Sequence, residues 1–132
     1  MGNKALLLGL GMALVLDVPA SALTFRAENR VTVTAAAGGS DVTNGGGLGA
    51  RGMWCAAADY ARDVLGAWGT QRIYVARDRA SGEGGPVRFT LDPSGLAPVA
   101  VLIVGVSIRR AGANLSVDHA QSFCADARLI NR

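Results

Sequence analysis

The chain has 132 residues, half of them hydrophobic, and a formal net charge of +3 at pH 7. So small a charge argues against a nucleic-acid-binding protein, because Arg109 and Arg110 are the only adjacent basic residues and no stripe of basic and aromatic side chains accompanies them. Two cysteines and one histidine are also too few to predict a zinc site.

The N-terminus has the three-part layout of a secretory signal peptide. Lys4 precedes the apolar run Ala5–Leu16, and the small residues Ala20–Ala22 follow. The run is shorter than the roughly 20 residues that a membrane-spanning helix needs. We therefore expect residues 1–22 to be cleaved off after Ala22, leaving no stable membrane span. The protein is predicted to be exported, to the bacterial periplasm or the extracellular medium.

The remaining chain has the size of one domain. We expect an N-terminal strand and glycine-rich loop in residues 23–52, and the compact α+β part of the same domain in residues 53–132. Two cysteines in an exported chain predict one disulfide, between Cys55 and Cys124. Closing a loop of that length restricts the unfolded chain by about 4 kcal/mol.

The first predicted strand is Arg30–Thr34, where polar and apolar residues alternate and place Val31 and Val33 on the core side. Thr24–Arg26 is a candidate extension of this strand. From Gly38 to Gly52, seven of fifteen residues are glycine and no periodic apolar pattern appears, which predicts a surface loop.

Two helices are predicted, over Met53–Trp68 and Val117–Leu129. In the first, Cys55 falls on the polar flank of the helix, whereas Cys124 in the second faces inward. The apolar face of the first helix and its polar face are each formed by residues at 3- and 4-residue spacing. The apolar residues are Trp54, Ala58, Ala61, Leu65 and Trp68, and the polar ones are Asp59, Arg62 and Asp63.

Three further strands are predicted between these helices. Arg72–Arg79 and Val87–Leu91 alternate apolar and polar residues, as expected for strands with one face in water. Val99–Ile108 is apolar almost throughout, which predicts a strand buried on both faces at the centre of the sheet. A buried helix is the alternative for that segment.

The order of these elements is strand, loop, helix, three strands, helix. Short connections favour an α+β domain: a small antiparallel β-meander of three to four strands with two helices packed on one face. The disulfide is expected to join the two helices.

Gly47–Gly52 matches the pattern G-x-G-x-x-G and precedes a predicted helix, as in dinucleotide-binding folds. The predicted preceding strand ends about ten residues before this pattern, and the following strands are expected to form hairpins. Glycine is also abundant throughout the chain. We therefore predict no cofactor, and anion binding near Arg51 remains a weaker alternative.

A catalytic thiol is not expected, because both cysteines are predicted to be oxidised. His119 and Cys124 are also five residues apart, so they do not face each other on one helix. Ser116, Asp118 and His119 have the residue types of a hydrolase triad, but triads are not built from sequence neighbours.

Four aspartates are candidates for a pair of catalytic carboxylates across the two helices: Asp59, Asp63, Asp118 and Asp126. Nothing in the sequence distinguishes them from solvated acids. Arg51, Trp54 and His119 form the candidate binding surface. For Trp54 and Trp68, core packing is favoured over an exposed aromatic patch.

Together these patterns predict a small exported, disulfide-stabilised binding or interaction protein without catalytic activity. Its expected partner is an envelope or extracellular protein, a polymer or an anion. The alternatives are a small secreted hydrolase that uses aspartate or His119, and an inhibitor of an extracellular enzyme that presents Gly38–Gly52.

Overall fold

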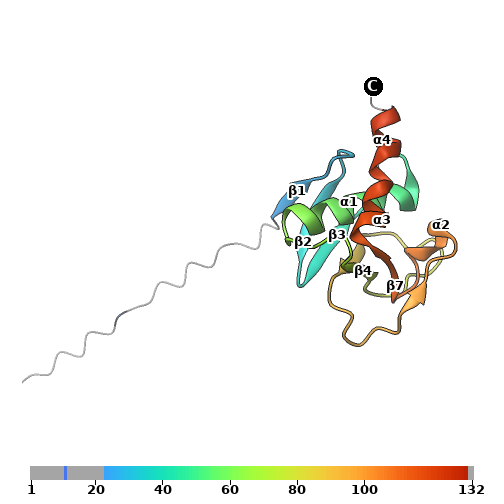
Figure 1. Ribbon diagram of the computed structural model, residues 1–132. Helices are drawn as coiled ribbons and strands as arrows, with labels where there is room; N and C mark the ends of the chain where they lie inside the picture. Colours follow the sequence, from blue (N-terminus) through green and yellow to red (C-terminus); the bar gives the residue numbers. More distant parts are fainter. Residues whose placement is uncertain (1–10, 12–22, 131–132) are drawn as a thin grey trace, which may run out of the picture.

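A computed structural model describes Gly11 and residues 23–130. The predicted signal peptide, residues 1–22, lies outside the described residues apart from Gly11. The described chain is an α+β domain built on one seven-stranded sheet, with strand order β1-β2-β3-β5-β4-β7-β6 (Figure 1). The predicted fold class is therefore confirmed, but the predicted meander of three to four strands is wrong.

The strands are short, and each neighbouring pair is antiparallel except β6 and β7, which run parallel. The strands are β1 Thr24–Arg26, β2 Thr32–Ala36, β3 Gly39–Val42, β4 Arg72–Val75, β5 Val87–Thr90, β6 Val99–Ala100 and β7 Ala113–Ser116. The helices are α1 Gly49–Asp63, α2 Val104–Ser107, α3 Val117–Ser122 and α4 Cys124–Ile130.

The sheet has one buried face and one wetter face. The register pairs Val33 with Val42, Val42 with Val87, and Val75 with Phe89, and all five side chains are buried. Because alternate residues of a strand point to opposite faces, these residues form one continuous apolar layer. Helix α1 packs on this layer, and α3 and α4 pack in turn on α1 (Figure 1).

Helix α1 is buried on every side along its middle. Trp54–Ala58 are five consecutive residues and none is more than 1% exposed. The prediction that Cys55 lies on a polar flank is therefore wrong, because the layer of α3 and α4 covers that side of the helix. Four of these residues are small, which lets the neighbouring elements approach closely.

The limits of both predicted helices need correction. Helix α1 begins at Gly49 and ends at Asp63, so Trp68 lies beyond it and is 78% exposed rather than packed in the core. The predicted helix over 117–129 is divided at Phe123 into α3 and α4. Cys124 begins α4, is fully buried and forms the predicted disulfide with Cys55.

The glycine-rich segment is not a simple surface loop. Residues 39–42 form β3, which pairs with β2 on one side and β5 on the other. A Cβ atom on Gly39 would lie 1.8 Å from the carbonyl oxygen of Phe89, so glycine is required where these two backbones meet. The glycine-rich segment has no periodic apolar pattern, so the sequence analysis did not predict this strand, which lies well inside the sheet.

The apolar segment 99–108 is not the central strand. It contributes the two-residue strand β6 at the edge of the sheet, followed by α2. The position next to β4 belongs instead to β7, where Arg72 on β4 donates from Nε to Asn114 Oδ1 at 2.8 Å. A polar cross-strand contact thus accompanies this pairing, whereas residues 99–108, predicted at the centre of the sheet, lie at its edge.

Candidate functional site

The two cysteines are held in a buried disulfide that joins α1 to the start of α4. A nucleophilic cysteine must be a thiolate that a substrate can reach. Neither sulfur meets this condition in the oxidised protein. The disulfide therefore has a structural role in the described fold.

The predicted serine–aspartate–histidine neighbours form the start of α3. The backbone N–H of His119 donates to Ser116 Oγ at 3.1 Å, so Ser116 caps this helix. The backbone N–H of Asp118 donates to the carbonyl oxygen of Gly69 at 2.9 Å. The His119 ring lies against Phe123, with 5.5 Å between ring centroids. These contacts show that Ser116, Asp118 and His119 have structural roles at the start of α3.

Two of the four candidate carboxylates have partners, and these partners differ. Asp126 pairs with Arg51 at 3.3 Å, and Asp59 Oδ2 accepts a hydrogen bond from the backbone N–H of Glu28 at 2.6 Å. Partial burial raises the pKa of Asp59, while the hydrogen bond from Glu28 acts in the opposite direction. Asp63 lies on the exposed end of α1 and adds a smaller charge repulsion at Asp59.

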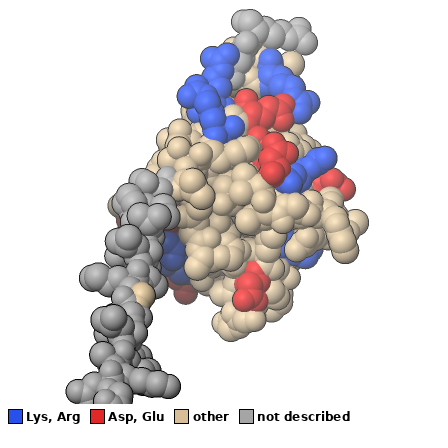
Figure 2. All heavy atoms as spheres, turned by 90° about the vertical axis from the view of Figure 1, so that its left-hand side faces the viewer, with Lys and Arg blue, Asp and Glu red and all other residues tan. Residues whose placement is uncertain are grey.

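Glu28 is a residue that sequence analysis did not single out. Its carboxylate pairs with Arg128 on α4, while its backbone contacts Asp59 on α1. Charged side chains of both signs gather at the end of the molecule that carries α4 (Figure 2). Because acids and arginines there are paired with one another, this cluster ties the β1–β2 turn to the two helices.

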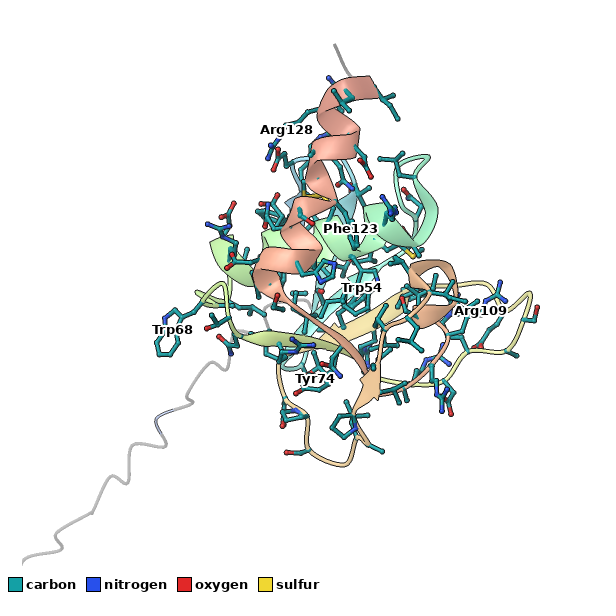
Figure 3. The ribbon with its side chains drawn as sticks, turned by 45° about the vertical axis from the view of Figure 1, so that its right-hand side comes forward. Trp54, Trp68, Tyr74, Arg109, Phe123 and Arg128 are labelled. Carbon is teal, nitrogen blue, oxygen red and sulfur yellow. A yellow bond between two sulfur atoms is a disulfide. The ribbon has the colours of Figure 1, made fainter. Side chains whose placement is uncertain are left out.

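The candidate binding surface of Arg51, Trp54 and His119 is only partly assembled. Arg51 and His119 are exposed and both contact Phe123, with the Arg51 guanidinium 5.1 Å from the centre of that ring. Trp54, in contrast, is fully buried and points into the core (Figure 3). It therefore cannot belong to a binding surface.

The glycines of the G-x-G-x-x-G pattern have structural explanations. Gly47 and Gly49 have φ angles of 88° and 58°, and a Cβ atom on Gly52 would lie 1.8 Å from the carbonyl oxygen of Gly45. Strand β3 ends at Val42, closer to the pattern than predicted. It is separated from β4 by the antiparallel strand β5, whereas dinucleotide-binding folds have adjacent parallel strands.

Three exposed apolar side chains gather around α2, apart from Trp68 and its neighbours at the end of α1. Leu102 is 91% exposed, Ile103 67% and Val106 55%. Together with Val99, Ala100 and Arg110 they border a hollow with a volume of about 160 Å³. Exposed apolar surface of this kind commonly marks a binding site. We call this region, residues 99–110, the α2 surface.

The α2 surface is anchored to the core from beneath. Trp54 Nε1 donates to Ser107 Oγ at 2.9 Å, and the same hydroxyl donates to the carbonyl oxygen of Val104 at 2.6 Å. The Trp54 ring also meets Phe89 edge-on, with 4.9 Å between ring centroids. The exposed apolar side chains therefore lie on a short helix and on the two residues before it, and the helix is fixed to the centre of the domain.

A second hollow, of about 410 Å³, lies on the wetter face of the sheet. It is bordered by Gly38, Arg88, Thr90, Asp92, Ser94 and Leu96. Arg88 is engaged by Asp41 through two contacts of 2.9 Å, and Ser94 by Asp92. The polar groups of this hollow thus have partners within the fold, whereas the α2 surface exposes the apolar side chains of Leu102, Ile103 and Val106.

Between residues 23 and 130 the structure contains no helix with the length and apolarity needed to cross a bilayer. The same residues contain no group of three histidine, cysteine or acidic side chains placed to hold a metal ion. Comparison of the chain with protein-family models, with curated proteins and with solved structures gives no match.

Proposed function

We propose that this chain is a small exported, disulfide-stabilised binding protein without catalytic activity, which holds a partner protein on the α2 surface. The observation that carries the proposal is the exposure of Leu102, Ile103 and Val106 around one hollow. Leaving three large apolar side chains in water forfeits roughly 1.5–3 kcal/mol for each one that could have been fully buried. A partner that covers them recovers part of this free energy.

Export is supported by two features of the chain. Residues 1–22 have the pattern of a cleavable signal peptide, and disulfides persist mainly in oxidising compartments. The Cys55–Cys124 bond fits such a compartment. Export also places the α2 surface among envelope or extracellular proteins.

The two alternative functions receive less support. The hydrolase hypothesis depends on aspartates or His119, which contribute to helix ends and to contacts between elements. The inhibitor hypothesis depends on residues 38–52 as a presented loop, but these residues contain β3 and the first turn of α1. We therefore retain the binding function.

Site-specific photocrosslinking tests this function. Benzoylphenylalanine is introduced at Leu102, in full-length protein produced by its native cells, and at Trp68 as a control on an exposed apolar residue elsewhere. We expect a defined protein adduct from position 102 and none from position 68. The proposal fails if position 102 yields no adduct, or if both positions yield the same one.

A further inference from the structure

We propose that the partner of the α2 surface presents an extended, acidic segment. This segment pairs with the free edge of β6 and places one large apolar side chain in the hollow beside α2. The inference rests on the proposed function and specifies the chemistry of its partner. It follows from the sheet edge, the position of the hollow and the charge around it.

Strand β6 is the last strand of the sheet, and within residues 23–130 its only neighbouring strand is β7. The Val99 N–H donates to the carbonyl oxygen of Gly112 at 2.9 Å, and the Val99 carbonyl oxygen accepts from Asn114 Nδ2 at 3.2 Å. Both backbone groups of Val99 therefore face β7. Because the direction alternates along a strand, the N–H and C=O of Ala100 face away from β7. An added strand can hydrogen-bond to such an edge.

The hollow lies where an added strand would place a side chain. The register pairs Val99 with Ala113, whose buried side chain belongs to the inner face of the sheet. The apolar layer on the buried face of the sheet thus continues past β6 into the hollow bordered by Ile103 and Val106. A strand added about 4.8 Å beyond β6 has its inward side chains at this level. The volume of about 160 Å³ is close to that of an apolar cavity that holds benzene, so one phenylalanine or leucine side chain fits.

The charge at this end of the molecule favours an acidic partner. Arg110 borders the hollow, and Arg109 is its neighbour in the sequence. Neither arginine takes part in the ion pairs found among the described residues. Arg109 projects beside α2 at the periphery of the molecule (Figure 3). Two copies of this chain meeting at β6 would bring these arginines together, which disfavours a second copy as the occupant.

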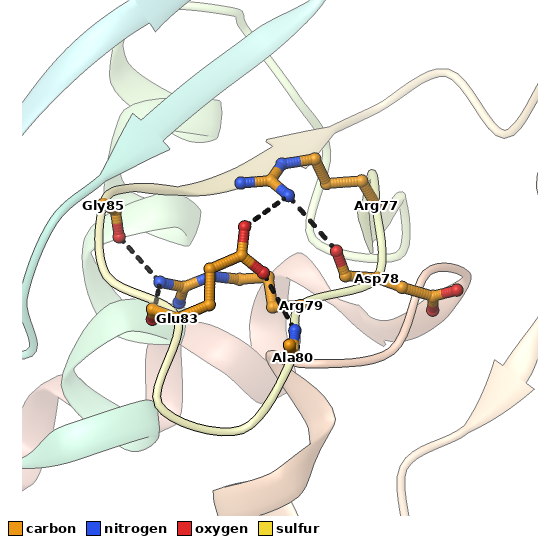
Figure 4. Close-up of polar contacts among 6 residues, drawn as sticks. All are labelled: Arg77, Asp78, Arg79, Ala80, Glu83 and Gly85. Atoms are coloured by element: carbon orange, nitrogen blue, oxygen red, sulfur yellow. Dashed lines mark hydrogen bonds and ion pairs between the residues drawn. The ribbon is translucent and has the colours of Figure 1, made fainter.

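Two acids of the loop that follows β4, Asp78 and Glu83, have partners within the domain. Glu83 accepts from Arg77 at 2.9 Å and from the backbone N–H of Ala80 at 2.8 Å (Figure 4). Asp78 accepts from the backbone N–H of Ala111 at 2.9 Å. This loop lies against the α2 surface, because the Arg79 N–H donates to the carbonyl oxygen of Arg109 at 2.9 Å. Neither acid forms an ion pair with Arg109 or Arg110, so carboxylates of a partner can pair with both arginines.

Fluorescence anisotropy with a labelled peptide tests the inference. The peptide is Thr-Glu-Val-Phe-Val-Glu-Thr with blocked ends, in which phenylalanine and both glutamates share one face of a strand. We expect saturable binding to the oxidised protein. Replacing phenylalanine by alanine, or both glutamates by lysine, should weaken binding about tenfold or more.

Methylation of peptide nitrogens tests the strand pairing. One peptide carries N-methyl groups on the two valines, and a second carries them on phenylalanine and the second glutamate. Because alternate N–H groups of a strand face opposite sides, only one of the two sets can face β6. We expect one methylated peptide to lose about tenfold in affinity and the other to retain most of it.

A charge reversal in the protein provides the matched control. Arg110→Glu should weaken binding of the glutamate peptide and strengthen binding of the lysine peptide. Arg62→Glu, at an exposed arginine on α1, makes the same charge change and should alter neither. Circular dichroism verifies that both variants fold.

The possible outcomes separate this inference from the proposed function. Peptide affinity that is unaffected by Arg110→Glu, or by both methylated sets, overturns the inference, and so does the absence of peptide binding. The binding function still stands in these cases if crosslinking at Leu102 succeeds. Binding to vesicles of phosphatidylglycerol and phosphatidylcholine without peptide binding would instead make the occupant a lipid surface. If the Leu102 adduct is also missing, both proposals fall.

Discussion

Strand β3 and the α2 surface have opposite relations between hydropathy and burial. Residues 39–42 are glycine, serine, aspartate and valine, yet they lie third in a sheet of seven strands and only Asp41 is partly exposed. Residues 99–108 are apolar at almost every position, yet they form an edge strand, a loop and a short exposed helix. The comparison shows that hydropathy does not decide where these segments lie. How closely each backbone can approach its neighbours matters more.

The physical difference lies in what each segment permits. Glycine at position 39 allows β3 and β5 to meet at a distance that any side chain would prevent. The α2 surface has no comparable close backbone approach in α2 itself, since a Cβ atom on Gly105 would meet nothing within 4 Å. The β3 side of the domain is therefore intolerant of added atoms, whereas α2 is tolerant of them and available to a partner.

The largest expected effect concerns the helices that cover the β3 side. Replacing both cysteines by alanine (Cys55→Ala with Cys124→Ala) removes a cross-link between residues 69 positions apart. We expect the free energy of unfolding to fall by about 4 kcal/mol, since the unfolded chain gains conformational entropy. Urea denaturation of the purified protein measures this change. A loss below about 1 kcal/mol would show that packing alone holds α4 on α1.

A smaller but still large effect is expected at the crossing of β3 and β5. Gly39→Ala places a methyl group 1.8 Å from the carbonyl oxygen of Phe89, so the two strands must separate. We expect a loss of about 3 kcal/mol in the free energy of unfolding. Gly84→Ala, where a Cβ atom meets nothing within 4 Å, is the matched control and should change it by less than about 0.5 kcal/mol. Equal effects of the two variants would contradict the close approach.

The sequence predicted those parts of the fold that depend on local pattern or on cysteine chemistry. The α+β class, the disulfide, the alternating strands Arg72–Arg79 and Val87–Leu91, and the existence of a helix that includes Met53–Asp63 were accessible in this way. The structure shortens the two strands to β4 and β5. Strand β3 was missed because its burial depends on Phe89, a residue 50 positions away from Gly39 that no local pattern connects to it.

The candidate site was predicted less well. Arg51 and His119 are exposed, as a binding surface requires, and Trp54 packs in the core against Ser107 and Phe89, as core packing predicted, so its place in the candidate binding surface was wrong. The α2 surface was missed because the apolar run was interpreted as core. A run of apolar residues predicts that something will cover it, and it does not tell whether the cover is this chain or a partner.

An intermediate effect is expected where the α2 surface is anchored. Ser107→Ala removes the acceptor of the Trp54 indole N–H, which is buried and then lacks a partner. We expect a loss of about 1–2 kcal/mol in the free energy of unfolding. Hydrogen exchange should also increase in residues 104–108 more than in β3. Ser81→Ala, at an exposed serine in a turn, is the control and should leave both measurements unchanged.

The smallest effect on stability is expected at the centre of the α2 surface. Leu102→Ser removes a side chain that is 91% exposed, so the free energy of unfolding should change by less than about 0.5 kcal/mol. Val42→Ser in β3 introduces the same polar residue at a side chain with no exposure. This variant should lower the free energy of unfolding by about 2 kcal/mol or more. If Leu102→Ser nevertheless abolishes the photocrosslinked adduct formed through a neighbouring position such as Val106, Leu102 contributes to binding rather than to folding. If instead it destabilises the domain as much as Val42→Ser does, residues 99–108 belong to the core after all, and the contrast between the two regions disappears.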